Sequence, residues 1–312
     1  MVKEDVLIEI DNLIKKFGKK LVLDRINLSI LDGEFFGIVG LSGSGKTTLL
    51  NILVGFWEPT IGRIIYNHNK IVRKNKSYIR QIFGFATQAG SVYPQLTVEE
   101  NLRYFGHLFN MRGSDIKERT EILLDLVELT GANKVLAGEL STGMQRRLDI
   151  ACALIHNPKV LILDEPTEDL DPVLRKELLA LLKRINDEGT TIIMTSHLLN
   201  DLETVCDRIA ILHNGYVIDV DSPDGLKSKY SKNEEIHLIS NPGDYKTILS
   251  KLNSSKISKY VIKRKKLVLY TTDAEDLLSS LLKVLAQLKE KIEDLMVTRP
   301  SMEEVFEAIT KR

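Results

Sequence analysis

Hydrophobic and polar positions follow two different spacings along the chain, and the changes between them outline its organisation. From about Asp5 to Leu31 apolar and polar residues alternate, with many β-branched side chains, which predicts strands. The dipeptide Asp32-Gly33 then predicts a hairpin turn between two such strands. From about residue 89 to 157 apolar positions recur at helical spacing. The pattern therefore predicts an α/β unit with an N-terminal antiparallel part and an all-helical insert.

Several short apolar runs outside these regions end in polar side chains. Continuous apolar runs are typical of strands that are buried on both faces of a parallel sheet. Such sheets bind ligands beyond the carboxyl ends of their strands, so we expect the polar residues to share one rim. They are Gln88 after residues 82–87, Asp164 and Glu165 after residues 160–163, and His197 after residues 191–196.

Residues 40–48 match the phosphate-binding pattern G-x-x-x-x-G-K-[ST] in the context that the pattern requires, between an apolar run and a helical stretch. Glycines let several backbone N–H groups point at one anion, and the helix N-terminus adds positive potential. Lys46 would reach the β- and γ-phosphates, and the Thr47 hydroxyl would ligate Mg²⁺. The predicted ATP-binding positions here are Gly40, Ser42, Gly43, Ser44, Gly45, Lys46, Thr47 and Thr48.

The two carboxylates at the end of residues 160–163 fit the same chemistry. Asp164 stands where a phosphate-loop enzyme has the acid on the Mg²⁺ side. Glu165 follows and could polarise a water molecule as a general base. The alternative is a solvated pair of carboxylates at a strand exit, and the phosphate loop upstream favours the functional interpretation.

Each of two further positions has two possible interpretations. Ser141 precedes a helical stretch, either as an ordinary N-cap or as part of a second anion site. Phe17 lies in a charged, turn-like stretch, where its ring either stacks on a base or covers a sheet edge. The residues alone favour the N-cap for Ser141 and leave the question open for Phe17.

Composition narrows the class of protein. The 312 residues contain 43 Lys+Arg and 43 Asp+Glu, so the chain lacks the basic excess that is common in nucleic-acid-binding proteins. The two cysteines, Cys152 and Cys206, fit neither a metal pair nor a disulfide framework. The first residues do not form a signal peptide, and no run approaches the length needed to span a bilayer. We therefore expect any membrane contact to come through a partner.

A composition change at residues 221–225 predicts a domain boundary near residue 226, with an N-terminal domain at 1–225 and an accessory domain at 226–312. Beyond it the predicted order is strand, helix, two strands, helix and strand, the order of a ferredoxin-like α+β unit, followed by one more helix. Two basic stretches, residues 70–80 and 263–266, are interpreted as solvated surface rather than as ligand sites.

The order of these features is more specific than any one of them. Along the chain stand Phe17, the phosphate loop, Gln88, Ser141-Thr142-Gly143, Asp164-Glu165, Leu170-Asp171 and His197. Over residues 4 to about 220 this order resembles the nucleotide-binding subunits of ABC transporters. The resemblance implies a RecA-like P-loop NTPase core in which two subunits close face to face around two ATP molecules.

The resemblance also implies a role for each matching residue. Phe17 would stack on adenine, and residues 43–48 would hold the phosphates. Mg²⁺ would be bound by Thr47 and Gln88, with Asp164 beside them.

The remaining roles concern hydrolysis and the second subunit. Glu165 would be the general base for water, and His197 would contact the γ-phosphate. Ser141 and Gly143 would complete the site on the opposite subunit, and Asp171 would link the two sites.

The chain departs from the family pattern at Thr142 and Met144, which replace a glycine and a glutamine, and at Asp169, where a glycine is common. Met144, the following arginines and residues 299–306 resemble the ATPase components of ABC-2-type exporters. We therefore expect an ATPase subunit on the cytoplasmic face of a membrane, bound to a separate multispanning permease, with no nucleic acid. The alternatives are a soluble ATPase of the same superfamily that acts on ribosomes or DNA, and an inactive nucleotide-binding protein.

Overall fold

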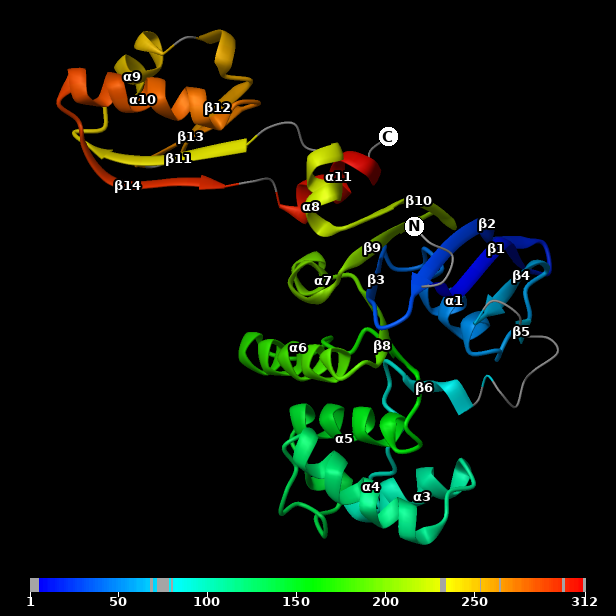
Figure 1. The fold of residues 1–312 in the computed structure, drawn as a ribbon. Helices are drawn as coiled ribbons and strands as arrows, with labels where there is room; N and C mark the ends of the chain where they lie inside the picture. Colours follow the sequence, from blue (N-terminus) through cyan, green and yellow to red (C-terminus); the bar gives the residue numbers. More distant parts are fainter. Residues whose placement is uncertain are drawn as a thin grey trace. The chain divides into compact units, whose positions relative to one another are not determined.

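The chain folds into two compact units, Met1–Ser222 and Pro223–Arg312, in a computed structural model (Figure 1). The structure describes residues 6–67, 70–71, 79, 81–230, 234–252, 254–263, 265–298 and 301–310. Most of the basic stretch at residues 70–80, and Arg264 in the second basic stretch, lie outside the described residues.

The N-terminal unit begins with an antiparallel sheet in the order β2-β1-β4-β5. Its hairpin turn lies at Gly18-Lys19, because Phe17 at the end of β1 pairs with Lys20 at the start of β2. The hairpin predicted at Asp32-Gly33 is therefore wrong, since this turn carries the chain from one sheet into another. The strands are β1 (Val6–Phe17), β2 (Lys20–Leu31), β4 (Ile61–Tyr66) and β5 (Lys70–Ile71).

The second sheet of this unit has the order β10-β9-β3-β8-β7-β6. Strand β3 runs parallel to β8 and β9, and β7 runs parallel to β6 and β8, while β10 is an antiparallel edge. Every residue of β3, β7 and β8 is buried, as the continuous apolar runs predicted. The strands are β3 (Phe35–Val39), β6 (Phe83–Ala86), β7 (Val160–Asp164), β8 (Thr191–Ser196), β9 (Arg208–His213) and β10 (Tyr216–Asp221).

The helical insert lies between β6 and β7 and is built from α3, α4 and α5, which pack on one another (Figure 1). Thr97 and Glu100 form the predicted capping box at the start of α3. The insert is α3 (Val98–Leu108), α4 (Gly113–Leu126) and α5 (Thr142–Leu154), with a 3₁₀ turn at Ala137–Glu139. The other helices are α1 (Lys46–Leu53), α6 (Pro172–Asp187) and α7 (Leu199–Val205).

The C-terminal unit contains a four-stranded antiparallel sheet in the order β12-β13-β11-β14, with α9 and α10 on one face (Figure 1). This is the strand order of the predicted ferredoxin-like unit. Helices α8 and α11 pack on each other. The elements are α8 (Pro223–Tyr230), β11 (Glu234–Asn241), α9 (Tyr245–Lys251), β12 (Lys259–Lys263), β13 (Lys266–Thr271), α10 (Ala274–Leu288), β14 (Lys291–Thr298) and α11 (Met302–Thr310).

Buried and partly exposed side chains alternate along β11, and the buried ones lie on the face that the helices cover. Ile236 and Leu238 are fully buried and share a cluster with Leu277 and Leu281 of α10. The register pairs Ile236 with Leu269 of the neighbouring strand, so apolar residues at matching positions face the same helix.

Replacing Ile236 by alanine should destabilise the C-terminal unit by about 2–5 kcal/mol, because the buried side chain leaves a cavity. Hydrogen exchange of the full chain, read in peptides from residues 234–298, measures this loss. The control is Ile262→Ala on the same sheet, where the side chain is 42% exposed and the loss should be small. Equal loss of protection in both variants would contradict this account of the core.

Candidate functional site

A cleft of about 760 Å³ lies beyond the carboxyl ends of β3, β6, β7 and β8, with the hairpin of β1 and β2 on one side. The polar residues predicted to share a rim therefore do meet there, with the exception of Asp164, which is buried at the end of β7. The cleft is lined by Phe17, Lys20, Val22, Leu41, Ser42, Gly43, Gly45, Lys46, Thr47, Thr48, Gln88, Glu165, Glu168 and His197.

The phosphate-binding loop connects β3 to α1, and glycines shape it. Gly43 and Gly45 have φ angles of 79° and 110°, in the left-handed region that favours glycine. A Cβ on Gly40 would lie 2.4 Å from the carbonyl oxygen of Leu212, so a side chain does not fit there. The hydroxyl of Ser44 is buried within this loop and has no hydrogen-bond partner in the structure. An anion bound in the loop would give this hydroxyl an acceptor.

Lys46 begins α1, and its side chain is only 7% exposed. Its ammonium group donates to the carbonyl oxygen of Gly40 at 2.8 Å and pairs with Oε1 of Glu165 at 3.1 Å. The other carboxylate oxygen of Glu165, Oε2, accepts from Nδ1 of His197 at 2.6 Å and from the His197 backbone N–H at 3.1 Å. Glu165 thus joins the phosphate loop to the end of β8.

These contacts determine the charge of Glu165. Burial raises the pKa of its carboxyl group, but attraction to Lys46 and hydrogen bonds from His197 and Lys46 outweigh burial, so the net pKa lies below the ordinary value. Glu165 is therefore an anion at neutral pH.

Thr195 of β8 holds both acidic residues in place. Its hydroxyl donates to Oδ1 of Asp164 at 2.6 Å and accepts from the backbone N–H of Glu165 at 3.0 Å. The backbone of Glu165 has a φ angle of 52°, which is uncommon for a residue with a side chain. The sequence analysis did not single out Thr195. The available signal was a polar hydroxyl near the end of an otherwise apolar run that predicts a buried strand.

Glu168 is a second residue that the sequence analysis missed. It lines the cleft, and its Oε2 accepts a short hydrogen bond from Nε2 of Gln88. Its position three residues after Glu165, within the turn that follows β7, was the available signal.

Phe17 lies at the tip of the first hairpin and lines the cleft with 42% of its surface exposed. Its ring meets Trp57 edge to face, with centroids 5.0 Å apart, and the ammonium of Lys15 lies 4.7 Å from the ring centre. The aromatic ring is therefore held at the rim of the cleft rather than in the core.

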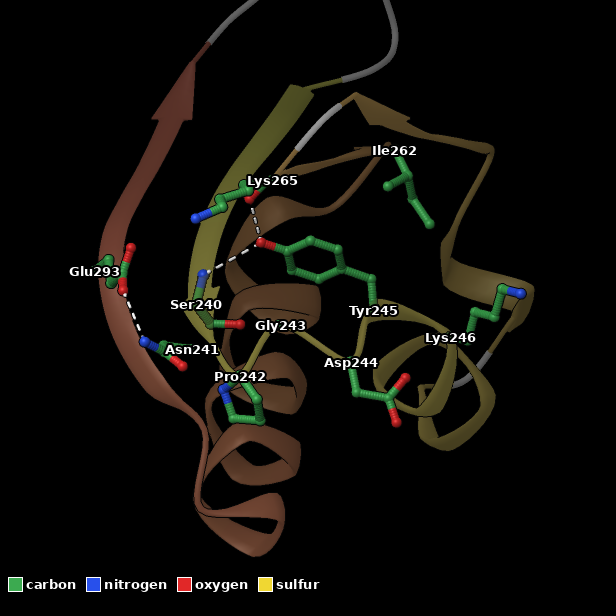
Figure 2. Close-up of a pocket in the computed structure, with 10 residues that line it drawn as sticks. All are labelled: Ser240, Asn241, Pro242, Gly243, Asp244, Tyr245, Lys246, Ile262, Lys265 and Glu293. Atoms are coloured by element: carbon green, nitrogen blue, oxygen red, sulfur yellow. Dashed lines mark hydrogen bonds between the residues drawn. The ribbon is translucent and has the colours of Figure 1, made fainter.

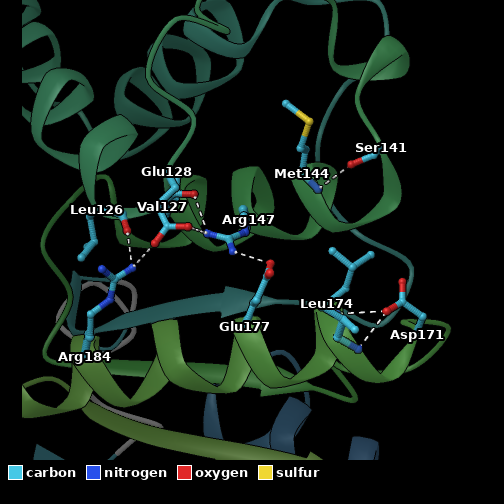
Figure 3. A network of polar contacts seen from close by, with 11 residues as sticks. Leu126, Val127, Glu128, Ser141, Met144, Arg147, Asp171, Leu174, Glu177 and Arg184 are labelled. Carbon is cyan, nitrogen blue, oxygen red and sulfur yellow. Dashed lines mark hydrogen bonds and ion pairs between the residues drawn. The ribbon is translucent and has the colours of Figure 1, made fainter.

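Ser141, Gly143 and Asp171 lie outside the cleft, at the neighbouring ends of α5 and α6 (Figure 3). The Ser141 hydroxyl caps α5 by accepting from the N–H of Met144 at 3.3 Å, and Asp171 caps α6. A Cβ on Gly143 would lie 3.1 Å from the side chain of Leu174, so the two helix ends approach closely.

Ion pairs continue this contact between the insert and α6 (Figure 3). Arg147 of α5 pairs with Glu128 at 2.7 Å and with Glu177 of α6 at 3.3 Å. Arg184 of α6 pairs with the same Glu128 at 2.9 Å. The network therefore links α6 to the part of the insert that carries Ser141.

A second cavity, of about 440 Å³, lies in the C-terminal unit (Figure 2). The Tyr245 hydroxyl accepts from the N–H of Ser240 at 3.3 Å and donates to the carbonyl oxygen of Lys265, and Asn241 donates to Glu293. These contacts tie the β11–α9 loop to the neighbouring strands. The polar groups of this cavity serve the fold, so the cleft of the N-terminal unit is the functional candidate.

Among the described residues, no helix is both long enough and apolar enough to cross a membrane. The same residues contain no cluster of three or more His, Cys, Asp or Glu side chains that could hold a metal ion by themselves.

The fold and the cleft define a phosphate-loop nucleotide-binding protein. Comparison with known proteins gives the family: residues 23–168 match the ABC transporter family. The linearmycin resistance ATP-binding protein LnrL of Bacillus subtilis is 34% identical over 74% of both chains. The Nod factor export ATP-binding protein I of Rhizobium sp. is 32% identical over 98% of both chains.

Similar solved structures indicate the same family. The dimeric ABC transporter cassette MJ0796 superimposes with a TM-score of 0.62 and 31% identity, covering 69% of this chain and 98% of that one. A second structure of that cassette, with a TM-score of 0.61, is a post-hydrolysis state bound to ADP and phosphate. The chain belongs to the ABC transporter family as an ATP-binding, ATP-hydrolysing subunit.

Replacing Thr195 by valine should lower the free energy of unfolding of the N-terminal unit by about 2 kcal/mol, because the buried Asp164 loses a hydrogen bond. Urea unfolding followed by the fluorescence of Trp57, the one tryptophan of the chain, measures this. Thr195→Ser keeps the hydroxyl and should lose less. If serine and valine cost the same, the hydroxyl does not support the two carboxylates.

Proposed function

We propose that two copies of this chain close around two ATP molecules and drive export through a separate membrane permease. One observation carries the proposal: Lys46, Glu165 and His197 line the cleft, whereas Ser141 and Asp171 do not and instead cap α5 and α6. The family resemblance gives Ser141 and Asp171 a role at the nucleotide, and from outside the cleft they would reach the nucleotide of another copy. The dimeric cassette among the similar structures supports this arrangement.

In each copy the loop from Gly40 to Thr48 binds the phosphates through backbone N–H groups, the α1 N-terminus and Lys46. The buried, unpartnered hydroxyl of Ser44 fits a ligand that accepts hydrogen bonds. Phe17 stacks on the base, since its ring is fixed at the rim of the cleft beside Trp57.

Mg²⁺ fits the oxygen donors at the floor of the cleft. The Thr47 hydroxyl and the Gln88 amide oxygen, which line the cleft, are hard ligands of the kind that Mg²⁺ prefers, and Asp164 is the buried carboxylate at the end of β7. Mg²⁺ usually shares its coordination with waters and substrate phosphates, so a few protein oxygens suffice. When bound, the ion neutralises charge on the phosphates.

Glu165 acts as the general base. It is anionic at neutral pH and takes a proton from the attacking water, while the new bond to the γ-phosphorus forms and the bond to the bridging oxygen breaks. Nδ1 of His197 donates to the Glu165 carboxylate, so Nε2 donates to a γ-phosphate oxygen when the imidazole carries both protons. The γ-phosphate also competes with Glu165 for Lys46, which frees the carboxylate for the water.

Closure of the dimer follows from the divided site. Ser141 and Gly143 at the start of α5 donate to the γ-phosphate of the opposite copy, and Asp171 joins the two sites. ATP favours the closed state because it makes contacts there that the open state lacks. Hydrolysis removes those contacts and reopens the dimer.

Export is the direction that the relatives support. The names of two of them refer to linearmycin resistance and to Nod factor export. The match to the second covers 98% of both chains, which supports an accessory domain at residues 226–312 as a shared part of such proteins. The chain would work on the cytoplasmic face of the membrane, where ATP is available, peripheral through its partner.

The permease has a suitable docking surface on the N-terminal unit. An apolar groove of about 660 Å³ lies between α3 and β6 and receives aromatic side chains from both. Phe56 is 68% exposed and Leu108 is 58% exposed at this groove, so two large apolar side chains are exposed at one site. An amphipathic helix of the membrane partner would cover them. The other lining residues include Phe83, Phe85, Phe105 and Phe109.

Glu165→Gln should keep ATP binding, lower turnover at least about 100-fold and trap a dimer in ATP, because only the base is lost. Light scattering during size exclusion measures the dimer, and phosphate release measures turnover. The matched control is Glu121→Gln, the same change on the exposed face of α4, which should behave like wild type. Wild-type turnover in the Glu165 variant would remove this residue from the role of base.

Leu108→Glu should abolish recovery of a multispanning partner when the chain is purified from detergent-solubilised membranes, because a charge enters the apolar groove. ATP hydrolysis by the isolated subunit should stay within about twofold of wild type, since surface substitutions seldom alter a distant site. Ile122→Glu is the control, since Ile122 is 48% exposed on α4 and does not line the groove. Recovery of ribosomal or DNA-bound partners with wild type would instead favour the soluble ATPase alternative.

A further inference from the structure

The turn that follows β7 brings a second carboxylate, Glu168, to the cleft that Glu165 also lines. Its Oε2 accepts a hydrogen bond from Nε2 of Gln88, which comes from the end of β6. We propose that Glu168 is a positioning residue that orients the amide of Gln88 so that its oxygen is available to Mg²⁺. This inference rests on the proposed function, in which Gln88 is a metal ligand.

The chemistry of the pair fixes which end of the amide faces Glu168. A carboxylate only accepts hydrogen bonds, and an amide offers its NH₂ as donor and its oxygen as acceptor. The amide nitrogen of Gln88 must therefore face Glu168, and the amide oxygen is left on the other side. Without the carboxylate, both orientations of the amide would be open, and the nitrogen end cannot ligate a cation.

Glu168 is itself held close to the catalytic base. Its backbone N–H donates to the carbonyl oxygen of Glu165 at 3.2 Å, so the two residues belong to one tight turn. The same turn has positive φ angles at Glu165 and at Asp169, 52° and 63°. Because Glu165 also contacts Lys46 and His197, the orientation of Gln88 is set by the same turn that places the base.

Two other roles for Glu168 are weaker. If Glu168 were a direct metal ligand, its carboxylate would have to give up the hydrogen bond from Gln88. In the structure, the carboxylate accepts that hydrogen bond. As an ordinary surface residue, its side chain would project to solvent, whereas it is half-buried and lines the cleft. The hydrogen bond across 80 positions of sequence favours a role exerted through Gln88.

The test measures metal affinity directly. Mn²⁺, which prefers the same oxygen ligands as Mg²⁺, is titrated into the full chain in the presence of a non-hydrolysable ATP analogue and followed by electron paramagnetic resonance. In Glu168→Ala the dissociation constant for Mn²⁺ should rise about tenfold, because the variant loses the hydrogen bond that orients a metal ligand. Affinity for ATP in EDTA should stay at the wild-type value, because the phosphate loop is intact.

Glu168→Gln is the matched variant, since its amide oxygen can still accept from Gln88 and should restore most of the metal affinity. In a Gln88→Ala background, removing Glu168 should have no further effect. Equal loss in the alanine and glutamine variants would overturn the proposal, because the negative charge itself would then bind the ion. An additive loss in the Gln88→Ala background would also overturn it.

The experiment distinguishes a failure of this inference from a failure of the proposed function. If wild type binds Mn²⁺ with the nucleotide analogue and Glu168→Ala is unchanged, only the positioning role fails. If the wild-type chain binds neither Mn²⁺ nor the nucleotide analogue, the proposed function fails and the inference fails with it.

Discussion

The buried ammonium group of Lys46 is the constraint on which the site depends. A cation that is only 7% exposed requires partners, and the chain supplies the Gly40 carbonyl and the Glu165 carboxylate. These partners come from the loop after β3 and from the end of β7, so one charge fixes the distance between two segments far apart in sequence. In the proposed mechanism an incoming phosphate competes with Glu165 for Lys46, so nucleotide binding also releases the proposed base.

The turn after β7 stores conformational strain close to this cation. Glu165 and Asp169 both have positive φ angles, at a cost of about 1–3 kcal/mol each. Two hydrogen bonds hold the turn in that shape: the backbone N–H of Glu165 donates to the Thr195 hydroxyl, and the backbone N–H of Glu168 donates to the Glu165 carbonyl oxygen. Three carboxylates thus lie within five residues at the carboxyl edge of a parallel sheet, each with a different environment.

Much of this could be predicted from the sequence because its signals are local. The phosphate loop, the buried strands and the ferredoxin-like order follow from spacing within short windows. The predicted hairpin at Asp32-Gly33 was wrong because the turn signal is local, whereas the choice of sheet depends on β3 being buried on both faces. Thr195 and Glu168 escaped notice for the same reason, since their partners lie 31 and 80 positions away.

The seam between the helical insert and α6 has a mechanical consequence. It contains charged pairs around Arg147 and a narrow approach of Gly143 to Leu174 (Figure 3). Ion pairs can exchange partners as two surfaces slide, whereas a close-packed core resists such shear. Salt concentration should therefore alter how tightly this edge of the insert is held against α6, because screening weakens exposed ion pairs and leaves apolar contacts unchanged.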